Sequence, residues 1–396
     1  MEKIYLDNAA TTPVRQEIID AMMPYLTEQW HNPSSLYSDG VKVKNVIEKA
    51  RETVGLFIGA KADEIYFTSS GSEANCWAIQ GFVNKVKKDC GEPFIITTKI
   101  EHHSIMECTK SMKELGCTVV YIDVNEHGFV DTDQLIDALE FGVKYVEAPE
   151  HILVSIQYAN NEIGTIQDIK TISGIVHEYG AKLHCDAVQA FGHVLINVSY
   201  LKIDMLSASG HKIGAPKGVG ILYKKNDMDI EPIIYGSQMN GLRGGTENAP
   251  YIIGFAEAVE LAKDTVADNT RISLAGNYFI DKLESIGCEL NGDSDYRLPN
   301  NINVILPEGV GGEEMMLSLD LAGIECSTGS ACNSRMKEPS YVLKAIGLSD
   351  EEAARSIRLT IPNDISFGDI DKVVDEIERC IKLIKGETIA WNGWGN

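Results

Sequence analysis

Two thiols lie in a run of small polar residues late in the chain, Cys326-Ser-Thr-Gly-Ser-Ala-Cys332-Asn-Ser. Such residues favour loops over packed cores. A thiol in a loop is accessible, and its thiolate is a nucleophile. Cys326 closes an apolar segment, Leu317–Cys326, and is expected to end a buried helix as a packing thiol. Cys332 lies beyond the small residues and is the candidate for chemistry.

A lysine among glycines is a second candidate. Lys212 follows an apolar run and lies in SGHKIGAPKGVG, residues 209–220. Glycines let a bulky group approach, and a lysine beyond a strand end can form a Schiff base with a carbonyl compound. The alternative is a solvated loop lysine, which for Lys212 taken alone is the better interpretation.

A carboxylate ends another apolar run. Asp186 lies in HCDAVQ, residues 184–189, where the strand-like pattern stops. A buried carboxylate needs a partner. The protonated ring nitrogen of pyridoxal phosphate is such a partner, because the cofactor needs an anion there to act as an electron sink. A helix cap or a backbone contact is the alternative.

A fourth signal is FTSSGSEAN, residues 67–75, which has the pattern of a strand end followed by a helix start. Backbone amides at a helix N-terminus suit a phosphate group. The G-K-[ST] of a Walker loop is absent, and an ordinary N-cap by Ser70 or Ser72 is the alternative. Each signal is weak alone, but this loop, the aspartate and the lysine in this order rarely arise by chance.

The elements around these residues are those of an α/β protein. Between about residues 63 and 224, β-rich runs alternate with amphipathic stretches such as 74–87 and 166–179. This pattern predicts a mostly parallel sheet with helices on both faces, and ligands bind beyond the strand carboxyl ends of such sheets. The seven expected strands are EIYFTS (64–69), FIITT (94–98), TVVYIDV (118–124), ILVSIQYA (152–159), AKLHCDA (181–187), DMLSAS (204–209) and GVGILY (218–223).

After about residue 255 the pattern predicts a smaller α+β unit. The Cys332 loop is expected there between two helices, and the final helix opens with a capping-box-like Ser366-Phe-Gly-Asp369. The predicted domains are a large one of residues 15–255 and a small one made of 1–14 and 256–396. The elements expected in the small unit are a long helix 253–286, a strand 301–306, helices 313–322 and 341–346, and a strand 356–361.

The composition of the chain limits the kinds of partner that it is expected to bind directly. The chain has 396 residues, and 35 basic against 58 acidic side chains give a net charge of −23. Such a charge does not favour nucleic acid or an anionic membrane as a direct partner. The nine cysteines include no C-x-x-C pair, so neither a metal site nor a disulfide framework is indicated. No secretory signal or membrane span is evident, and a reduced, cytoplasmic location is expected.

Taken together, the motifs resemble those of the cysteine desulfurases, a class V aminotransferase-like branch of the fold-type I pyridoxal phosphate enzymes. The resemblance covers nearly the whole chain, and the long loop before Cys332 resembles the group that passes sulfur to several acceptors. The motifs are YLDNAATTP (5–13), NPSSLYSDG (32–40), FTSSGSEAN (67–75), EHHS (101–104), ANNEIG (159–164), HCDAVQ (184–189), SGHKIGAPKGVG (209–220), RGGTEN (243–248), STGSAC (327–332), EPSYVLKAIGL (338–348) and SIRLT (356–360).

The resemblance implies pyridoxal 5'-phosphate as cofactor, with Lys212, Cys332 and His102 as catalytic residues. Lys212 binds the cofactor and then acts as acid and base, Asp186 pairs with the ring nitrogen, and His102 stacks on the ring. His103 is expected to be a structural histidine with satisfied hydrogen bonds. The other implied contacts are Gln189 to the phenolic oxygen, Asn160 to ring and substrate, Gly71, Ser72, Ser209 and His211 to the phosphate, Thr246 to the phosphate of the other subunit of a homodimer, and Arg358 and Asn32 to the substrate carboxylate.

The implied reaction converts L-cysteine to L-alanine and leaves a persulfide on Cys332. The sulfur then passes to an acceptor protein, such as an iron–sulfur scaffold or a tRNA-thiolation enzyme. A selenocysteine lyase and a class V aminotransferase are alternatives, but both leave Cys332 without a role. A weakly active sulfur-carrier or scaffold-binding subunit is a third.

Three places depart from the family pattern and motivate that third alternative. Tyr37 stands where many relatives have histidine, Asn240 replaces a usual basic residue, and Pro362-Asn363 replace a glycine and an arginine. We expect these departures to flank the substrate pocket and to affect substrate preference or partners. The tail AWNGWGN, residues 390–396, is expected to be a disordered or surface-packed end, with partner binding as the alternative.

Overall fold

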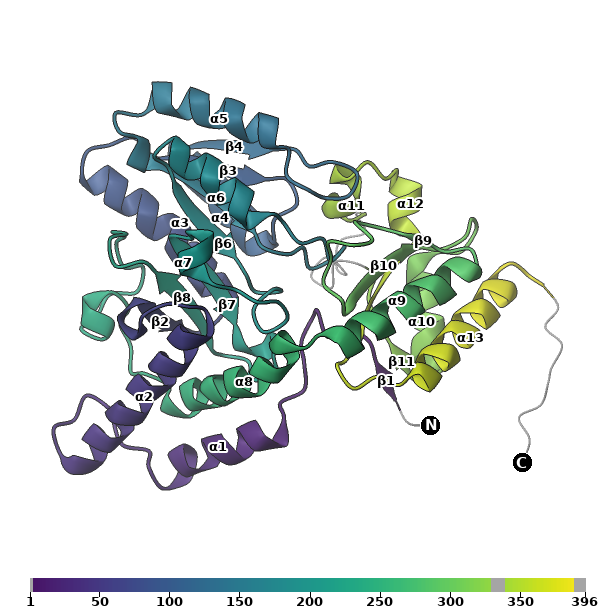
Figure 1. Ribbon diagram of the computed structural model, residues 1–396, viewed down its shortest axis with the longest axis horizontal. Helices are drawn as coiled ribbons and strands as arrows, with labels where there is room; N and C mark the ends of the chain where they lie inside the picture. The colour runs from purple at the N-terminus through teal and green to yellow at the C-terminus, as the bar shows by residue number, and fades with distance from the viewer. Residues whose placement is uncertain (1–2, 329–338, 388–396) are drawn as a thin grey trace.

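The computed structural model describes residues 3–328 and 339–387 and contains a seven-stranded sheet (Figure 1). All seven predicted strands are confirmed, and the sheet order is β2-β8-β7-β6-β5-β3-β4. The pairs β3/β4, β3/β5, β5/β6 and β6/β7 are parallel, and β8 runs antiparallel to both of its neighbours, β2 and β7. The strands are β2 Ile65–Thr68, β3 Phe94–Thr98, β4 Thr118–Ile122, β5 Ile152–Gln157, β6 Lys182–Asp186, β7 Met205–Ser209 and β8 Gly220–Lys224.

Both faces of this sheet are buried. Neighbouring residues of β3 enter different apolar clusters: Phe94 and Ile96 pack into one, and Ile95 into the other. This is the alternation that a strand imposes on successive side chains. Helices α3 and α4 cover one face, and α1, α2, α5, α6 and α8 contribute to the core on the other. Their bounds are α1 Gln16–Thr27, α2 Ser38–Phe57, α3 Gly71–Lys88, α4 His103–Glu114, α5 Thr132–Tyr145, α6 Ile169–Glu178, α7 Val198–Leu201 and α8 Ala249–Ala267.

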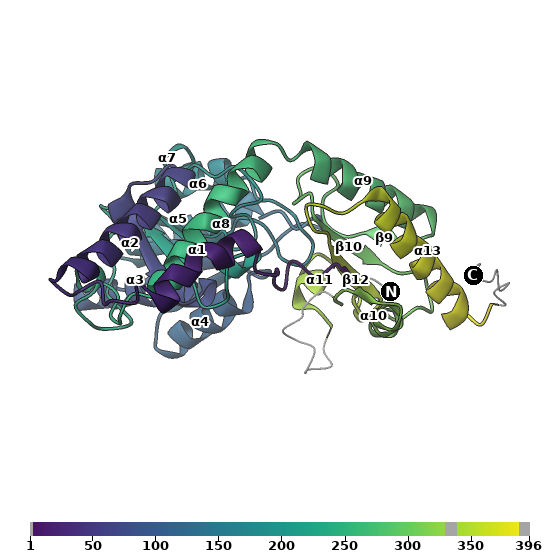
Figure 2. The same ribbon diagram turned by 90° about the horizontal axis from the view of Figure 1, so that it is seen from below.

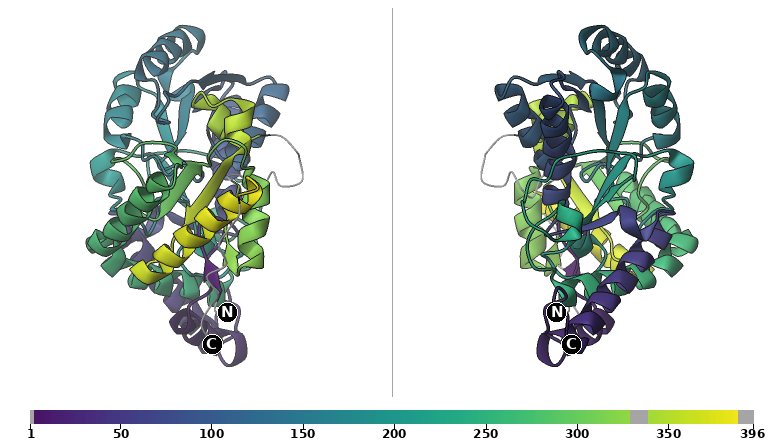
Figure 3. Two further views of the ribbon diagram at one scale, coloured as in Figure 1. Left: turned by 90° about the vertical axis from the view of Figure 1, so that its right-hand side faces the viewer. Right: turned by 90° about the vertical axis from the view of Figure 1, so that its left-hand side faces the viewer.

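A second, smaller apolar core is built around a three-stranded sheet, β12-β10-β9. Helix α13 lies between α9 and α10 (Figure 3). The first strand, β1, pairs with β11 in this part, and the chain then crosses to α1, which packs on α8 (Figure 2). The bounds are β1 Ile4–Tyr5, α9 Thr270–Ser285, β9 Glu289–Leu290, β10 Asn301–Ile305, α10 Gly312–Leu321, β11 Ile324–Glu325, α11 Tyr341–Ala345, α12 Asp350–Ala354, β12 Ser356–Thr360 and α13 Phe367–Ile384.

Two sequence-based expectations for this part are wrong. The long helix 253–286 is two helices, because Asp268 takes an extended backbone conformation and its carboxylate accepts from the amide of Thr270. Cys326 does not end a helix: α10 stops at Leu321, Gly323 adopts a φ of 83°, and the short β11 follows. Glycine tolerates this left-handed φ without steric cost, so the chain turns from helix to strand there.

Other expectations agree with the structure or stay predictions. Ser366 caps α13 and accepts from the amide of Asp369 at 3.0 Å, as its capping-box-like sequence predicts. The domain boundaries at 14/15 and 255/256 stay predictions. Helix α8 runs through the second of them, and its buried residues as far as Val259 pack in the core of the large sheet. Among residues 3–328 and 339–387, no helix is both long enough and apolar enough to cross a membrane.

Candidate active site

A cavity of about 350 Å³ opens at the carboxyl ends of β6 and β7. Its volume is at the small end of the range of about 300–1,000 Å³ that is usual for small-molecule sites. The strand register explains why polar residues lie close together here, since Asp186 at the end of β6 pairs with Ser207 near the end of β7. The predicted site residues that line the cavity are Gly71, Ser72, His102, Asp186, Gln189, Ser209, His211, Lys212 and Arg358.

Lys212 lies in a short 3-10 turn, Gly210–Lys212, directly after β7. Its Nζ donates to the carbonyl oxygens of Ala9 and Ala10, the latter at 2.9 Å. The amine is therefore held at the cavity wall by the N-terminal segment. This segment contains the motif YLDNAATTP, residues 5–13, whose sequence alone suggested no role at the site. Gln189 Nε2 also donates to the Ala9 carbonyl, at 3.0 Å.

Asp186 is almost fully buried, and both carboxylate oxygens have donors. Oδ1 accepts from the amide of Val188 at 3.0 Å, and Oδ2 accepts from Asn75 Nδ2 at 2.7 Å. The backbone contact considered as an alternative is thus real and uses one oxygen. Asn75 is a site residue that sequence reasoning missed, although it ends the 67–75 motif. It orients the carboxylate and also donates to Ser104 Oγ at 2.9 Å.

His102 caps the start of α4, and its ring nitrogens are distinguishable. The amide of Ser104 donates to His102 Nδ1 at 3.1 Å, so this nitrogen carries no proton, and Ser104 Oγ lies 2.8 Å from it. The proton of the neutral ring is therefore on Nε2. Burial lowers the pKa of His102, with Lys212 and His103 acting in the same direction and Asp186 opposing them. The imidazole is accordingly neutral at neutral pH.

The start of α3 forms one wall of the cavity, and its backbone amides suit an anion. Ser70 is the N-cap and accepts from the amide of Glu73 at 3.1 Å. Gly71 and Ser72 follow in the first turn, where backbone amides lack partners within the helix. A Cβ on Gly71 would approach Val188 Cγ2 to 2.6 Å, so only glycine lets the helix start come this close. Ser209 lies opposite, 3.3 Å from the same Cβ position.

His211 closes this wall beside the lysine. Its Nδ1 lies 3.2 Å from Thr11 Oγ1. Burial, together with the charges of Lys212 and Lys217, lowers the pKa of His211 to about 4. This imidazole is therefore a neutral hydrogen-bonding group.

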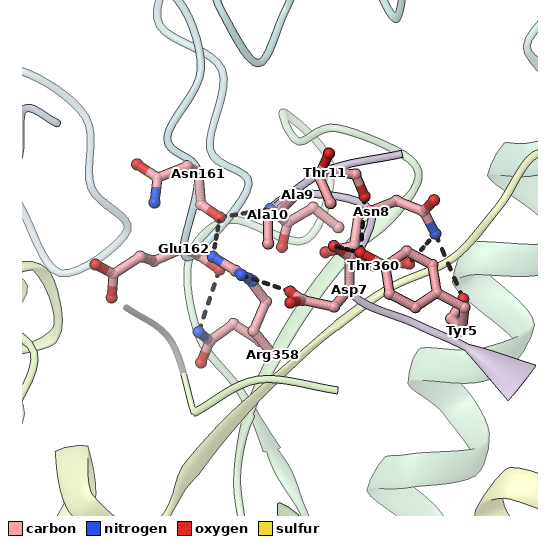
Figure 4. Close-up of polar contacts among 12 residues, drawn as sticks. Tyr5, Asp7, Asn8, Ala9, Ala10, Thr11, Asn161, Glu162, Arg358 and Thr360 are labelled. Atoms are coloured by element: carbon pink, nitrogen blue, oxygen red, sulfur yellow. Dashed lines mark hydrogen bonds and ion pairs between the residues drawn. The ribbon is translucent and has the colours of Figure 1, made fainter. Parts of the chain in front are cut away.

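Arg358, on the central part of β12, is 2% exposed (Figure 4). Its Nη2 lies 2.7 Å from Asp7 Oδ1, and its Nη1 donates to the Asn161 carbonyl at 3.1 Å. The surface salt bridge considered as an alternative is thus a buried one inside the cavity wall. Asp7 and Glu162, which also borders the cavity, were not singled out from the sequence, although both lie in quoted motifs.

Three predicted residues do not line the cavity. Asn160 is fully buried, and its amide donates to Ile100 O while its Oδ1 accepts from the amides of Glu162 and Ile163. It shapes the loop that places Asn161 and Glu162. Asn32 and Thr246 are exposed, and their roles stay predictions. Cys332 and the tail 390–396 lie outside the described residues.

The residues that depart from the family pattern do not line the cavity either. Tyr37, Asn240, Pro362 and Asn363 are absent from its lining, so the expectation that they flank the substrate pocket finds no support there. His103 lines the cavity, and its ring centroid lies 5.0 Å from that of Tyr341 in an edge-to-face arrangement. Its Nε2 is buried without a hydrogen-bond partner among the described residues, and the structural role expected for His103 stays a prediction.

Residues 4–373 match the family model of the class-V aminotransferases. The chain belongs to the class-V aminotransferase family. Within it, the chain is 44% identical to the cysteine desulfurase IscS of Dictyoglomus turgidum, covering 97% of this chain and 95% of that one. It is 41% identical to the cysteine desulfurase IscS of Methanosarcina thermophila, with 96% and 93% covered. The predicted membership of the cysteine desulfurase branch is therefore confirmed.

Solved structures agree with this class-V assignment. A NifS-like protein superposes with a TM-score of 0.88 at 30% identity, covering 96% of this chain and all of that one. A structure described as SspA in complex with cysteine gives a TM-score of 0.79 at 32% identity, covering 91% and 99%. The predicted fold-type I architecture is confirmed as well.

The cavity residues fit the pyridoxal phosphate on which class-V enzymes depend. The amine of Lys212 would supply the covalent link to the cofactor, and the buried carboxylate of Asp186 would be the partner of its ring nitrogen. The N-terminus of α3, where Gly71 carries no side chain, would face its phosphate. Asn75 Oδ1 is buried without a partner among the described residues, which leaves polar capacity beside Asp186.

Proposed function

We propose that this chain is a pyridoxal-phosphate-dependent cysteine desulfurase that carries sulfur as a persulfide on Cys332. The observation that carries the proposal is one cavity with Lys212, Asp186 and Arg358 in its wall. Two kinds of relative support the proposal. Proteins named cysteine desulfurase align with this chain over almost their whole length, and the similar SspA structure is described as a complex with cysteine. The substrate is L-cysteine, and the products are L-alanine and transferable sulfur.

The charged side chains of the cavity have separate roles in the proposed reaction. The Arg358 guanidinium holds the substrate carboxylate, since its planar fork matches that group. The Lys212 amine would hold the cofactor in its resting state and would take the proton from the substrate Cα during the reaction. Asp186 keeps a negative charge at the ring nitrogen, with Asn75 fixing its orientation. When bound, the cofactor supplies an electron sink for the charge that develops at Cα.

Cys332 completes the reaction from a segment attached to the same wall. Ser327 and Arg358 exchange two backbone hydrogen bonds, of 2.6 and 3.2 Å. Cys332 follows Ser327 by five residues, and five residues of extended chain span at most about 17 Å. The chain length thus supports reach from the anchor to a substrate held by Arg358. The thiolate forms a sulfur–sulfur bond, and the substrate carbon–sulfur bond breaks.

We also propose a homodimer and a sulfur-acceptor protein as partners, with the enzyme in the cytoplasm. Thr246 is exposed, which suits the contact with the partner subunit's phosphate that the family resemblance implies. Large apolar side chains are exposed near α2, including Trp30 at 68% and Leu36 at 96%. Exposed aromatic and apolar groups support an interface on this side. The acceptor is an iron–sulfur scaffold or a tRNA-thiolation enzyme.

The test is a product assay on purified protein loaded with pyridoxal phosphate. We expect L-cysteine and a reductant to yield alanine and sulfide in equal amounts. Alanine without sulfide, or amino transfer that requires a keto acid, would replace the proposal by the aminotransferase alternative. Turnover of selenocysteine with none of cysteine would favour the lyase.

A further inference from the structure

A forked ion pair joins the start of α3 to a loop far along the chain. Arg243 Nε donates to Glu73 Oε1 at 2.8 Å, and Arg243 Nη2 donates to Glu73 Oε2 at 3.1 Å. Two parallel bonds of this kind fix both the distance and the orientation of the two groups. The Glu73 and Arg243 side chains are 10% and 17% exposed, so solvent screens their charges less than those of a surface pair. The proposed reaction assigns no role to either residue.

Glu73 holds the turn that begins α3. It follows Ser72 in the first turn of the helix, and its Oε2 accepts from the backbone amide of Ser69 at 2.7 Å and also from Ser69 Oγ. The amide of Glu73 in turn donates to Ser70 Oγ at 3.1 Å. Ser70, Gly71 and Ser72 line the cavity. The Glu73 carboxylate therefore fixes the turn whose backbone amides suit the cofactor phosphate.

This arrangement places a negative charge beside the same turn. Burial by itself would raise the pKa of the Glu73 carboxyl group, but hydrogen bonds from Arg243 and Ser69 lower that pKa below its ordinary value, so the group is ionised at neutral pH. The positive end of a helix attracts anions, and a fixed carboxylate in the first turn offsets part of that attraction. It would also repel a phosphate dianion bound at this turn. The Arg243 guanidinium, held on both carboxylate oxygens, neutralises the charge.

We propose that Arg243 is a positioning residue for the cofactor phosphate: it neutralises Glu73, so that Glu73 fixes the α3 turn without repelling the phosphate. The inference rests on the proposed function in one respect, which is that pyridoxal phosphate is the cofactor. Arg243 does not line the cavity, so its charge acts through Glu73 rather than by contact. The proposal gives a role to the first residue of the motif RGGTEN, residues 243–248, in which only Thr246 had an implied one.

The test compares two ligands that differ only in the phosphate group. The full-length chain, freed of cofactor with hydroxylamine, is titrated with pyridoxal 5'-phosphate or with pyridoxal, and the absorbance of the ligand bound to Lys212 gives each Kd. The titration is run at about pH 8, where the phosphate is a dianion. Arg243→Gln should raise the Kd for pyridoxal phosphate at least about fivefold and change that for pyridoxal less than about twofold, because only the phosphate is repelled by Glu73. Equal weakening of both ligands would overturn the proposal.

Variants of the two partners should act with opposite signs. Glu73→Gln removes the repelling charge and leaves the Arg243 cation without its counter-charge, so pyridoxal phosphate should bind at least as tightly as to the parent. The double variant Glu73→Gln/Arg243→Gln should therefore bind it within about twofold of the parent. Arg243→Lys, which keeps the charge and loses the fork, should bind it more tightly than Arg243→Gln. If Arg243 only held its own loop and Thr246 in place, the double variant would stay as weak as Arg243→Gln, and that result would refute the charge role.

Arg379→Gln is the matched control. Arg379 makes the same forked pair with Glu376 on α13, which packs in the smaller core, and its loss should leave both Kd values unchanged. Urea unfolding of each variant checks that the chain remains folded. A parent chain that binds neither ligand at Lys212 would contradict the proposed function itself. A parent that binds pyridoxal phosphate, with every Arg243 and Glu73 variant unchanged, would contradict only this inference.

Discussion

Arg358 and Asp7 form an ion pair of 2.7 Å that joins residues 351 positions apart in the chain (Figure 4). The pair links the N-terminal segment to β12. The same segment offers the Ala9 and Ala10 carbonyls to Lys212. One short stretch, residues 7–10, therefore contacts both the cation assigned to the substrate carboxylate and the amine assigned to the cofactor.

Asp7→Asn should impair substrate binding more than turnover. The change removes the ion-pair partner that lies 2.7 Å from the 2% exposed Arg358, and removal of one partner of a buried pair costs up to about 3–5 kcal/mol of unfolding free energy. We expect KM for L-cysteine to rise about tenfold with kcat within a few-fold, because Arg358 loses its orientation. Steady-state kinetics and urea unfolding measure the two effects. Glu17→Gln is the control, since Glu17 pairs with Arg15 at an exposed site and should change stability by at most about 1 kcal/mol.

Lys212→Ala should abolish covalent cofactor attachment. No other amine among the residues that line the cavity can form the Schiff base. We expect the visible absorbance of the bound cofactor to be lost, and borohydride treatment to leave no modified lysine in the digest. Lys217→Ala, an exposed lysine of the same loop, should keep both signals. A borohydride-stable adduct on another lysine of the variant would contradict the assignment.

Cys332→Ala should separate cofactor chemistry from sulfur release. The variant keeps Lys212 and Asp186, so cofactor absorbance should persist, while sulfide release from cysteine should fall at least about a hundredfold without the acceptor thiolate. Cys326→Ala is the matched control: burial raises the pKa of Cys326 to about 12, and its side chain packs on the small core. Undiminished sulfide release from Cys332→Ala would exclude the persulfide role.

Glu101→Gln should change the pH dependence of stability. Glu101 is fully buried, and burial raises the pKa of its carboxyl group to about 8 from an ordinary 4.5. Between these values the folded protein keeps a proton that the unfolded chain has lost, so stability falls as pH rises, by at most about 1.4 kcal/mol per pH unit. Urea unfolding at pH 5 and pH 8 should show this fall in the parent and a smaller one in the variant. The exposed Glu92→Gln should behave as the parent, and an unchanged slope in Glu101→Gln would contradict the prediction.

The sequence predicted the large sheet well because its signal is local. Apolar runs such as Phe94–Thr98 and Met205–Ser209 are buried on both faces and read as strands without knowledge of their neighbours. The helix across residues 253–286 was predicted wrongly for a related reason. Periodicity continues through Asp268, and only the local capping of Thr270 breaks it.

The sequence by itself determined the chemical inventory: Lys212, Asp186, His102 and Arg358 were recognised from motifs whose residue types suit one cofactor. Only the tertiary structure decided which other residues hold these side chains in place. Asn75 on Asp186, Asp7 on Arg358 and the Ala9 carbonyl at Lys212 lie 111, 351 and 203 positions away along the chain. A hydrogen bond made between residues so far apart in the chain leaves no periodic trace in the sequence, because periodicity reports only on neighbours within one helix or strand.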